Sequence, residues 1–113
     1  MSKFDEKVAL YEKFMDGKGI SYKADLLKAV TKGLGPSIYK KDAETVSGTD
    51  KKELETVKKN FLIKKLGLSD SSDLDSAIDS VLEKIGKSER SKYRAVVYYM
   101  LAVHFGKESV YGM

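Results

Sequence analysis

Hydrophobic residues recur along most of the chain at intervals of three and four, which is the spacing of one face of an α-helix. The first stripe consists of Phe4, Val8, Tyr11 and Met15, and Gly17 follows it. No stretch alternates apolar and polar residues in the manner of a half-buried strand. The pattern therefore predicts five helices, at about residues 3–16, 22–32, 51–66, 73–85 and 89–105.

The third predicted helix carries the clearest end signals. Asp50 followed by Glu53 forms a capping box, in which each side chain can accept from a free backbone N–H. Gly67 followed by Leu68 is typical of a helix C-cap with its trailing hydrophobic contact. Between these signals, residues 61–66 (FLIKKL) place apolar side chains on several sides of the helix. This end is therefore expected to be deeply buried or bent.

The fifth predicted helix is apolar nearly all round from residue 95 to residue 105. Such a helix lies at the centre of a core or is covered by a partner. The expected fold is all-α, a compact bundle of four to five short helices with the fifth, at about residues 89–105, in the centre. Nothing marks a domain boundary, so residues 1–113 are expected to form a single domain with a loose tail at about residues 107–113.

Composition excludes several classes of site. The chain of 113 residues has no cysteine, so it has no disulfide, thiolate metal site or cysteine nucleophile. The longest uncharged run, residues 95–103, is too short to cross a bilayer, and the N-terminus lacks the apolar run of a secretion signal. We therefore expect a soluble cytoplasmic protein with no membrane contact. The net charge of +4 comes mainly from lysine and is only a weak indication of anionic partners.

The sequence KGLGPSIYKK places Gly33 and Gly35 directly after Lys32. A nucleotide-binding loop would need a preceding strand and a different glycine spacing. The turn is closer to the glycine-hydrophobe-glycine turn of helix-hairpin-helix DNA-binding motifs, where backbone N–H groups hold a phosphate. Pro36 removes one such donor, however, and Tyr39 replaces the small residue of that motif. The preferred interpretation is a helix C-cap followed by a turn that begins with proline.

Three lysine doublets recur at about seven-residue spacing in the third predicted helix. At 100° per residue, Lys51, Lys58 and Lys65 lie within about 40° of one another, and such a face could follow a phosphate backbone. The interleaved Glu53 and Glu55 favour an ordinary solvated surface instead. Sequence-nonspecific nucleic-acid binding through these lysines and the glycine turn is therefore the alternative functional hypothesis, not the preferred one.

Tyrosines gather near the end of the chain. Tyr98 and Tyr99 add aromatic surface to the fifth helix, and Tyr111 follows nearby. Tyrosine suits interfaces because its ring is apolar and its hydroxyl can form a hydrogen bond. These rings are expected to face either another segment of this chain or a partner, which would be a second copy or an unknown protein. The preferred functional hypothesis is a non-enzymatic protein that acts through protein–protein interaction or self-association.

No catalytic or metal-binding pattern stands out in the sequence. His104 is the only histidine, and no serine or carboxylate accompanies it at a matching spacing. The acidic fourth helix does not form a calcium loop, because counting from Asp73 puts Ala77 at position five and Lys84 at position twelve. Its first-turn carboxylates complement the helix dipole instead. We therefore expect no enzymatic activity, no metal and no cofactor.

Several stretches together resemble a family of small bacterial proteins classed as a domain of unknown function. The resemblance runs through most of the chain and implies a compact helical bacterial cytosolic protein. The family has no assigned activity, so the resemblance transfers no catalytic residue. The stretches that carry it are KGLGPSIY (32–39), DAETVSG (42–48), NFLIKKLGL (60–68), KYRAVVYYML (92–101) and FGKESVY (105–111).

Overall fold

The structure is a computed structural model that describes residues 3–48, 50–86, 88–89 and 91–112. Over these residues it is all-α, as predicted, and its only strand-like feature is an isolated antiparallel bridge between Thr45 and Tyr93. None of the described helices is long and apolar enough to cross a membrane. The elements in chain order are α1 (Lys3–Gly17), α2 (Ala24–Gly33), η1 (Gly35–Tyr39), α3 (Lys41–Glu44), α4 (Lys51–Thr56), η2 (Val57–Ile63), α5 (Ser72–Ile85), α6 (Arg94–His104) and η3 (Glu108–Tyr111).

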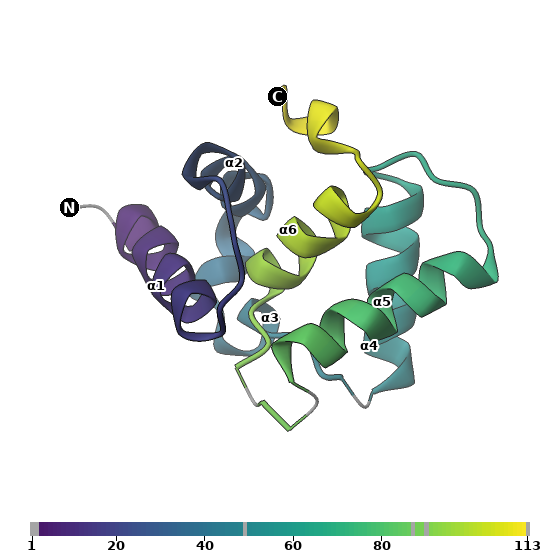
Figure 1. The fold of residues 1–113 in the computed structure, drawn as a ribbon, viewed down its shortest axis with the longest axis horizontal. Helices are drawn as coiled ribbons and strands as arrows, with labels where there is room; N and C mark the ends of the chain where they lie inside the picture. The colour runs from purple at the N-terminus through teal and green to yellow at the C-terminus, as the bar shows by residue number, and fades with distance from the viewer. Residues whose placement is uncertain (1–2, 49, 87, 90, 113) are drawn as a thin grey trace.

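Helix α6 lies at the centre of the fold, which confirms the prediction from its all-round apolar sequence. It packs against α1, α2, α3 and α5, and Figure 1 shows it between the α1–α2 pair and the α4–α5 pair. Every residue from position 95 to position 102 is buried, and Val96, Val97 and Leu101 are completely enclosed. Burying one such side chain stabilises the folded state by about 1.5–3 kcal/mol. This single helix therefore supplies a large part of the stability that comes from hydrophobic burial.

Helix α6 begins at Arg94, five residues later than the sequence predicted. The segment before it is extended, because Tyr93 forms the bridge to Thr45 and the Val46 N–H donates to the Lys92 carbonyl at 2.7 Å. That bridge ties the start of α6 to the segment just after α3. The predicted helix start at residue 89 is therefore wrong, since pairing with a distant segment replaces the first helical turns.

The third predicted helix forms as two joined pieces. Asp50 caps α4 as predicted, accepting from the Lys52 N–H at 2.9 Å. From Val57 the chain continues as the π-helical segment η2, whose wider turns are bonded from residue i to i+5. Phe61, Leu62 and the following Leu66 are all buried. The sequence predicted a deeply buried or bent end, and the structure shows a buried end in which the helix changes from α to π.

The glycine turn and the end of the chain meet beside α2. Helix α2 ends at Gly33. Gly35 is the first residue of the 3₁₀ turn η1 and adopts a positive φ of 62°, and Pro36 follows it. This matches the preferred interpretation of a helix end followed by a proline turn. Residues 108–111, which belong to the predicted tail, form η3, and Val110 and Tyr111 pack against the core.

A buried tyrosine fixes α1 to α3. The Tyr11 hydroxyl, on a completely enclosed side chain, donates to Glu44 Oε2 at 2.7 Å. Lys7 Nζ donates to the same oxygen at 2.8 Å. Burial and then the Glu44 carboxylate raise the pKa of Tyr11 well above its usual range, so this hydroxyl remains protonated and keeps its donor role.

Candidate functional site

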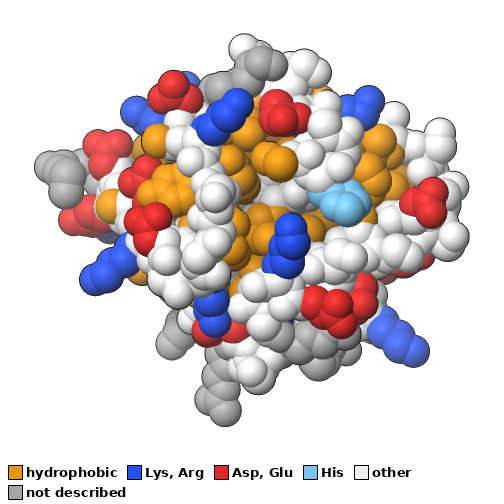
Figure 2. Space-filling model, viewed as in Figure 1, with side chains coloured by type: hydrophobic (Ala, Val, Ile, Leu, Met, Phe, Trp, Pro, Cys, Tyr) orange, Lys and Arg blue, Asp and Glu red, His pale blue; other side chains and the backbone are white. Residues whose placement is uncertain are grey.

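One hollow in the described surface is a cleft of about 510 Å³, here called the α5–α6 cleft. It opens on the face of the molecule seen in Figure 2, where hydrophobic side chains gather around a central depression. Three segments that are distant in the sequence form it, namely the loop after α1, the second half of α5 and the second half of α6. The lining residues are Lys18, Gly19, Ile20, Ser21, Ser80, Val81, Lys84, Tyr99, Met100, Val103 and His104.

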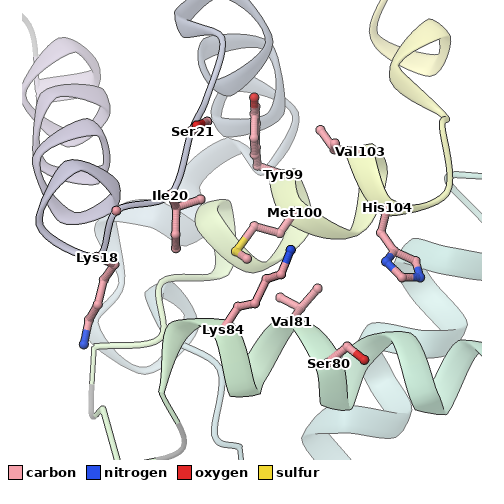
Figure 3. Close-up of a pocket in the computed structure, with 11 residues that line it drawn as sticks. Lys18, Ile20, Ser21, Ser80, Val81, Lys84, Tyr99, Met100, Val103 and His104 are labelled. Atoms are coloured by element: carbon pink, nitrogen blue, oxygen red, sulfur yellow. The ribbon is translucent and has the colours of Figure 1, made fainter.

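The floor of the α5–α6 cleft is apolar. Ile20 descends into it from the loop, Val81 rises from α5, and Met100 lies between them on α6 (Figure 3). Val103, which is 44% exposed, extends this apolar surface towards the end of α6. A cleft of this size with apolar walls and a few polar groups has the usual composition of a ligand or peptide site.

The polar groups around the floor include two lysines. The side chain of Lys84 extends over the cleft, whereas that of Lys18 points away from the floor (Figure 3). Lys18 Nζ is paired with Glu89 Oε2 at 2.8 Å. No ion pair of Lys84 is found among the described residues, although several other lysines have one. His104 stands at the other end of the floor.

Tyr99 forms part of the cleft wall but is only 4% exposed. Its hydroxyl points away from the floor and accepts a hydrogen bond of 2.7 Å from the Lys23 backbone N–H, at the start of α2. Lys23 is the residue before α2, so this bond satisfies one of the backbone donors that a helix start leaves free. Tyr99 therefore holds two walls of the cleft in place and presents little surface to a partner.

Tyr98 contacts other segments of this chain, which was one of the two alternatives expected from the sequence. Its ring stacks on Phe61 of η2 with a centroid distance of 4.0 Å. Its hydroxyl accepts from Arg94 Nη1 at 3.1 Å, while Arg94 Nε donates to the Ala43 carbonyl at 2.7 Å and Nη2 pairs with Glu53. Arg94 thus links α3, α4 and α6, and Tyr98 belongs to this internal network.

Tyr111 is half-buried at the junction of η3 and α2. Its Cε1 atom lies 3.5 Å from where a β-carbon on Gly33 would stand, and Lys65 Nζ lies 5.2 Å from its ring centroid. Burial, with a smaller effect of Tyr98, raises the pKa of Tyr111 to about 12. The three tyrosines singled out in the sequence therefore hold segments of this chain together, and only Tyr111 retains appreciable exposed surface.

The residues of the nucleic-acid hypothesis do not form the face calculated for them. That face assumed one continuous α-helix through Lys51, Lys58 and Lys65, whereas the chain turns into a π-helix at Val57. Lys58 is 12% exposed and is held by Asp70 at 3.0 Å and Asp75 at 3.1 Å, and hydrogen bonds to these carboxylates raise its pKa. Its charge is therefore already neutralised within the chain.

The remaining residues of that hypothesis are spread around the molecule. Lys32 and Lys51 are exposed, on α2 and α4 respectively. Lys65 lies over the Tyr111 ring, and Tyr111 in turn covers Gly33. Gly35 is exposed in the turn that follows. The structure thus brings Gly33 and Lys65 to the same tyrosine, which fills the space beside the turn.

Sequence reasoning did not find the α5–α6 cleft. The apolar character of the fifth predicted helix placed Met100 in the core, and Ile20 had no predicted role because it falls between two predicted helices. Lys84 was noted only as a residue that breaks a calcium pattern. The one available signal was that the apolar surface of the fifth helix continues all round to residue 105, farther than an internal stripe requires.

Comparison with known proteins gives a family without an assigned activity. A search of curated proteins found no match to this chain. The sequence pattern of a family described as protein of unknown function (DUF2853) matches residues 10–109. This range includes α2, α5, α6 and all the residues that line the α5–α6 cleft. The chain therefore belongs to the DUF2853 family of proteins of unknown function.

Proposed function

We propose that the chain is a non-enzymatic interaction module that binds another protein through the α5–α6 cleft. The observation that carries the proposal is the apolar lining of a depression of about 510 Å³, where Val103 is 44% exposed and Ile20 is half-buried, next to the largely buried Met100. Exposed apolar surface that is concave and rimmed by polar groups is typical of a binding site. Isolated apolar residues on a convex surface would need no such explanation.

The chemistry of the cleft favours binding over catalysis. Its serine hydroxyl groups come from Ser21 and Ser80, and its imidazole comes from His104. Within the described part of the chain, no hydrogen bond joins either serine to His104. An activated nucleophile requires such a contact to a base. The cleft therefore offers hydrogen-bonding groups around an apolar surface, which is what recognition of a peptide segment needs.

The proposal is tested with a display library of random 12-residue peptides selected on the immobilised protein. Val103→Gln places a polar group in the cleft, and Leu10→Gln makes a similar change on α1, where Leu10 is 38% exposed. Both changes replace an exposed apolar residue on a helix with a good helix former, so their effects on folding should be small. The two variants therefore form a matched pair.

Enriched peptides should bind the wild type and Leu10→Gln equally and Val103→Gln about tenfold more weakly, because the amide adds polar surface where apolar contacts were made. Fluorescence anisotropy of labelled peptides measures this difference. The absence of any enriched peptide would overturn the proposed function. Equal binding to all three proteins would show that the binding surface lies elsewhere.

A further inference from the structure

We infer that the segment bound in the α5–α6 cleft is acidic and amphipathic, with apolar side chains on the floor and a carboxylate paired with Lys84. This inference rests on the proposed function, because it specifies the chemistry of a partner at the same cleft. It commits to a segment of another protein as the occupant. Three features support it, namely the position of Lys84, the difference between Lys84 and Lys18, and the character of the groups nearby.

The position of Lys84 is the first observation. A lysine on an exposed helix surface usually extends its ammonium group into water, away from apolar neighbours. Lys84 is exposed, but its side chain extends over the cleft in Figure 3, across the apolar lining that includes Val81 and Met100. A cation placed over an apolar floor binds a carboxylate more strongly than one in open solvent, because the covering ligand excludes water from the pair.

The contrast with Lys18 is the second observation. Lys18 belongs to the same cleft, but its ammonium group points outward and is already paired with Glu89 at 2.8 Å. Lys84 has no ion pair among the described residues, and Asp79 and Glu83 on the same helix have interactions of their own. The charge of Lys84 is thus the one in the cleft that a partner can still neutralise.

The surroundings of Lys84 are the third observation. Ser80 lies one turn before it on α5, and His104 stands at the end of the floor, so hydroxyl and imidazole groups are available to a bound acid. The described residues that line the cleft include no Asp or Glu. A basic or strongly electropositive segment would therefore gain only apolar contacts and would face the Lys84 charge. Charge complementarity selects the acidic partner.

The test uses the peptides enriched on the wild-type protein, each synthesised with its acidic residues intact and with Glu replaced by Gln. Binding is measured to the wild type, to Lys84→Gln, and to Lys28→Gln as a control. Lys28 is exposed on α2 and does not line the cleft. A separate selection on Lys84→Glu asks whether reversing the charge reverses the preferred peptide charge. Decanoate, a small apolar carboxylate, and light scattering of the free protein serve as further arms.

Lys84→Gln should bind acidic peptides about tenfold more weakly than the wild type does, and the Glu-to-Gln peptides should lose the same factor of affinity for the wild type. Combining the protein change with the peptide change should lower the affinity no further. Selection on Lys84→Glu should yield basic peptides, and Lys28→Gln should behave as the wild type. Peptides that need Val103 but show no acid preference would overturn the inference and leave the proposed function standing. If decanoate binds but no peptide is enriched, the cleft holds a small apolar acid and the inference is overturned. If the free protein is a dimer that Val103→Gln dissociates, the cleft holds a second copy of this chain and the inference is likewise overturned.

Discussion

The Arg94 network should be a major source of stability, and it can be tested by replacing the guanidinium while keeping the stem. The side chain is only 12% exposed, and each of its nitrogens that forms a described bond contacts a different element. Arg94→Met removes these donors but preserves most of the apolar contacts. It leaves the Ala43 carbonyl, the Tyr98 hydroxyl and the Glu53 carboxylate without their donor.

The expected loss can be worked out from these contacts. The donor to Ala43 lies at 2.7 Å and the donor to Tyr98 at 3.1 Å, and both come from a charged group. Hydrogen bonds to charged groups contribute about 1.5–3 kcal/mol each, but Glu53 is 25% exposed and water can replace part of its pairing. We therefore expect Arg94→Met to lower the free energy of unfolding by about 3 kcal/mol. For a domain of this size, this corresponds to a decrease in Tm of roughly 12 °C.

Urea unfolding followed by circular dichroism measures this loss, and a double-mutant cycle isolates the ion pair. Glu53→Gln alone should cost about 1 kcal/mol, and the coupling energy between Glu53 and Arg94 should be about 1–2 kcal/mol. Lys28→Met, on an exposed lysine of α2, controls for removing a cation and should change stability by less than about 0.5 kcal/mol. If the slope of the unfolding free energy against urea concentration is unchanged, unfolding of the variants still exposes the same amount of surface.

The reasoning is refuted if Arg94→Met loses less than about 1 kcal/mol, or if the coupling energy lies within about 0.3 kcal/mol of zero. A loss this small would mean that the contacts of Arg94 to Ala43 and Tyr98 contribute nothing beyond what water supplies. A coupling energy near zero would mean that Arg94 and Glu53 behave like an exposed surface pair.

Two further predictions concern Tyr111 and Gly35. Tyr111 has a raised pKa in the folded state, so its contribution is complete below pH 10 and is lost as the pH rises towards 12. Urea unfolding should therefore show that raising the pH from 9 to 11 lowers the free energy of unfolding of the wild type by about 1 kcal/mol more than that of Tyr111→Phe. Equal losses would contradict a raised pKa of Tyr111 in the folded state. Gly35→Ala should lower the free energy of unfolding by about 1 kcal/mol, because the backbone φ of 62° is unfavourable for alanine although the space around the position is open. Gly17→Ala serves as the control, since Gly17 also lies in open space but is the last residue of α1, and thermal unfolding should show it to be neutral or stabilising. Equal effects of the two alanines would contradict the strain argument.

The sequence was most informative where one physical cause dominated. Residues 95–102 are apolar on all sides, so a helix formed by them is stable only in the centre of the core, where the structure places it. The capping signal at Asp50 correctly predicted the start of α4. The start of α6 was misplaced because pairing with Thr45 depends on a segment almost fifty residues away. Local spacing carries no information about such a contact.

The candidate site was predictable only in part for a related reason. A tyrosine beside an apolar stripe looks the same in the sequence whether it meets another segment or another molecule, and Tyr98 proved to meet Phe61. The α5–α6 cleft depends on how closely the loop after α1 approaches α5 and α6. That approach is set by packing and by the bond from Lys23 to Tyr99, neither of which has a sequence pattern of its own.

The π-helical segment η2 has a consequence for how this chain can change in length. Each of its backbone rings closes over one residue more than in an α-helix, so the segment already accommodates an additional residue without disturbing its ends. Glu53 in α4 pairs with Arg94, and Phe61 in η2 stacks on Tyr98, so wider turns of the chain lie between these two contacts. Deleting exposed Asn60 would restore α-helical spacing but rotate one end against the other. Relatives that carry a one-residue deletion here should therefore show compensating changes at position 53 or position 61.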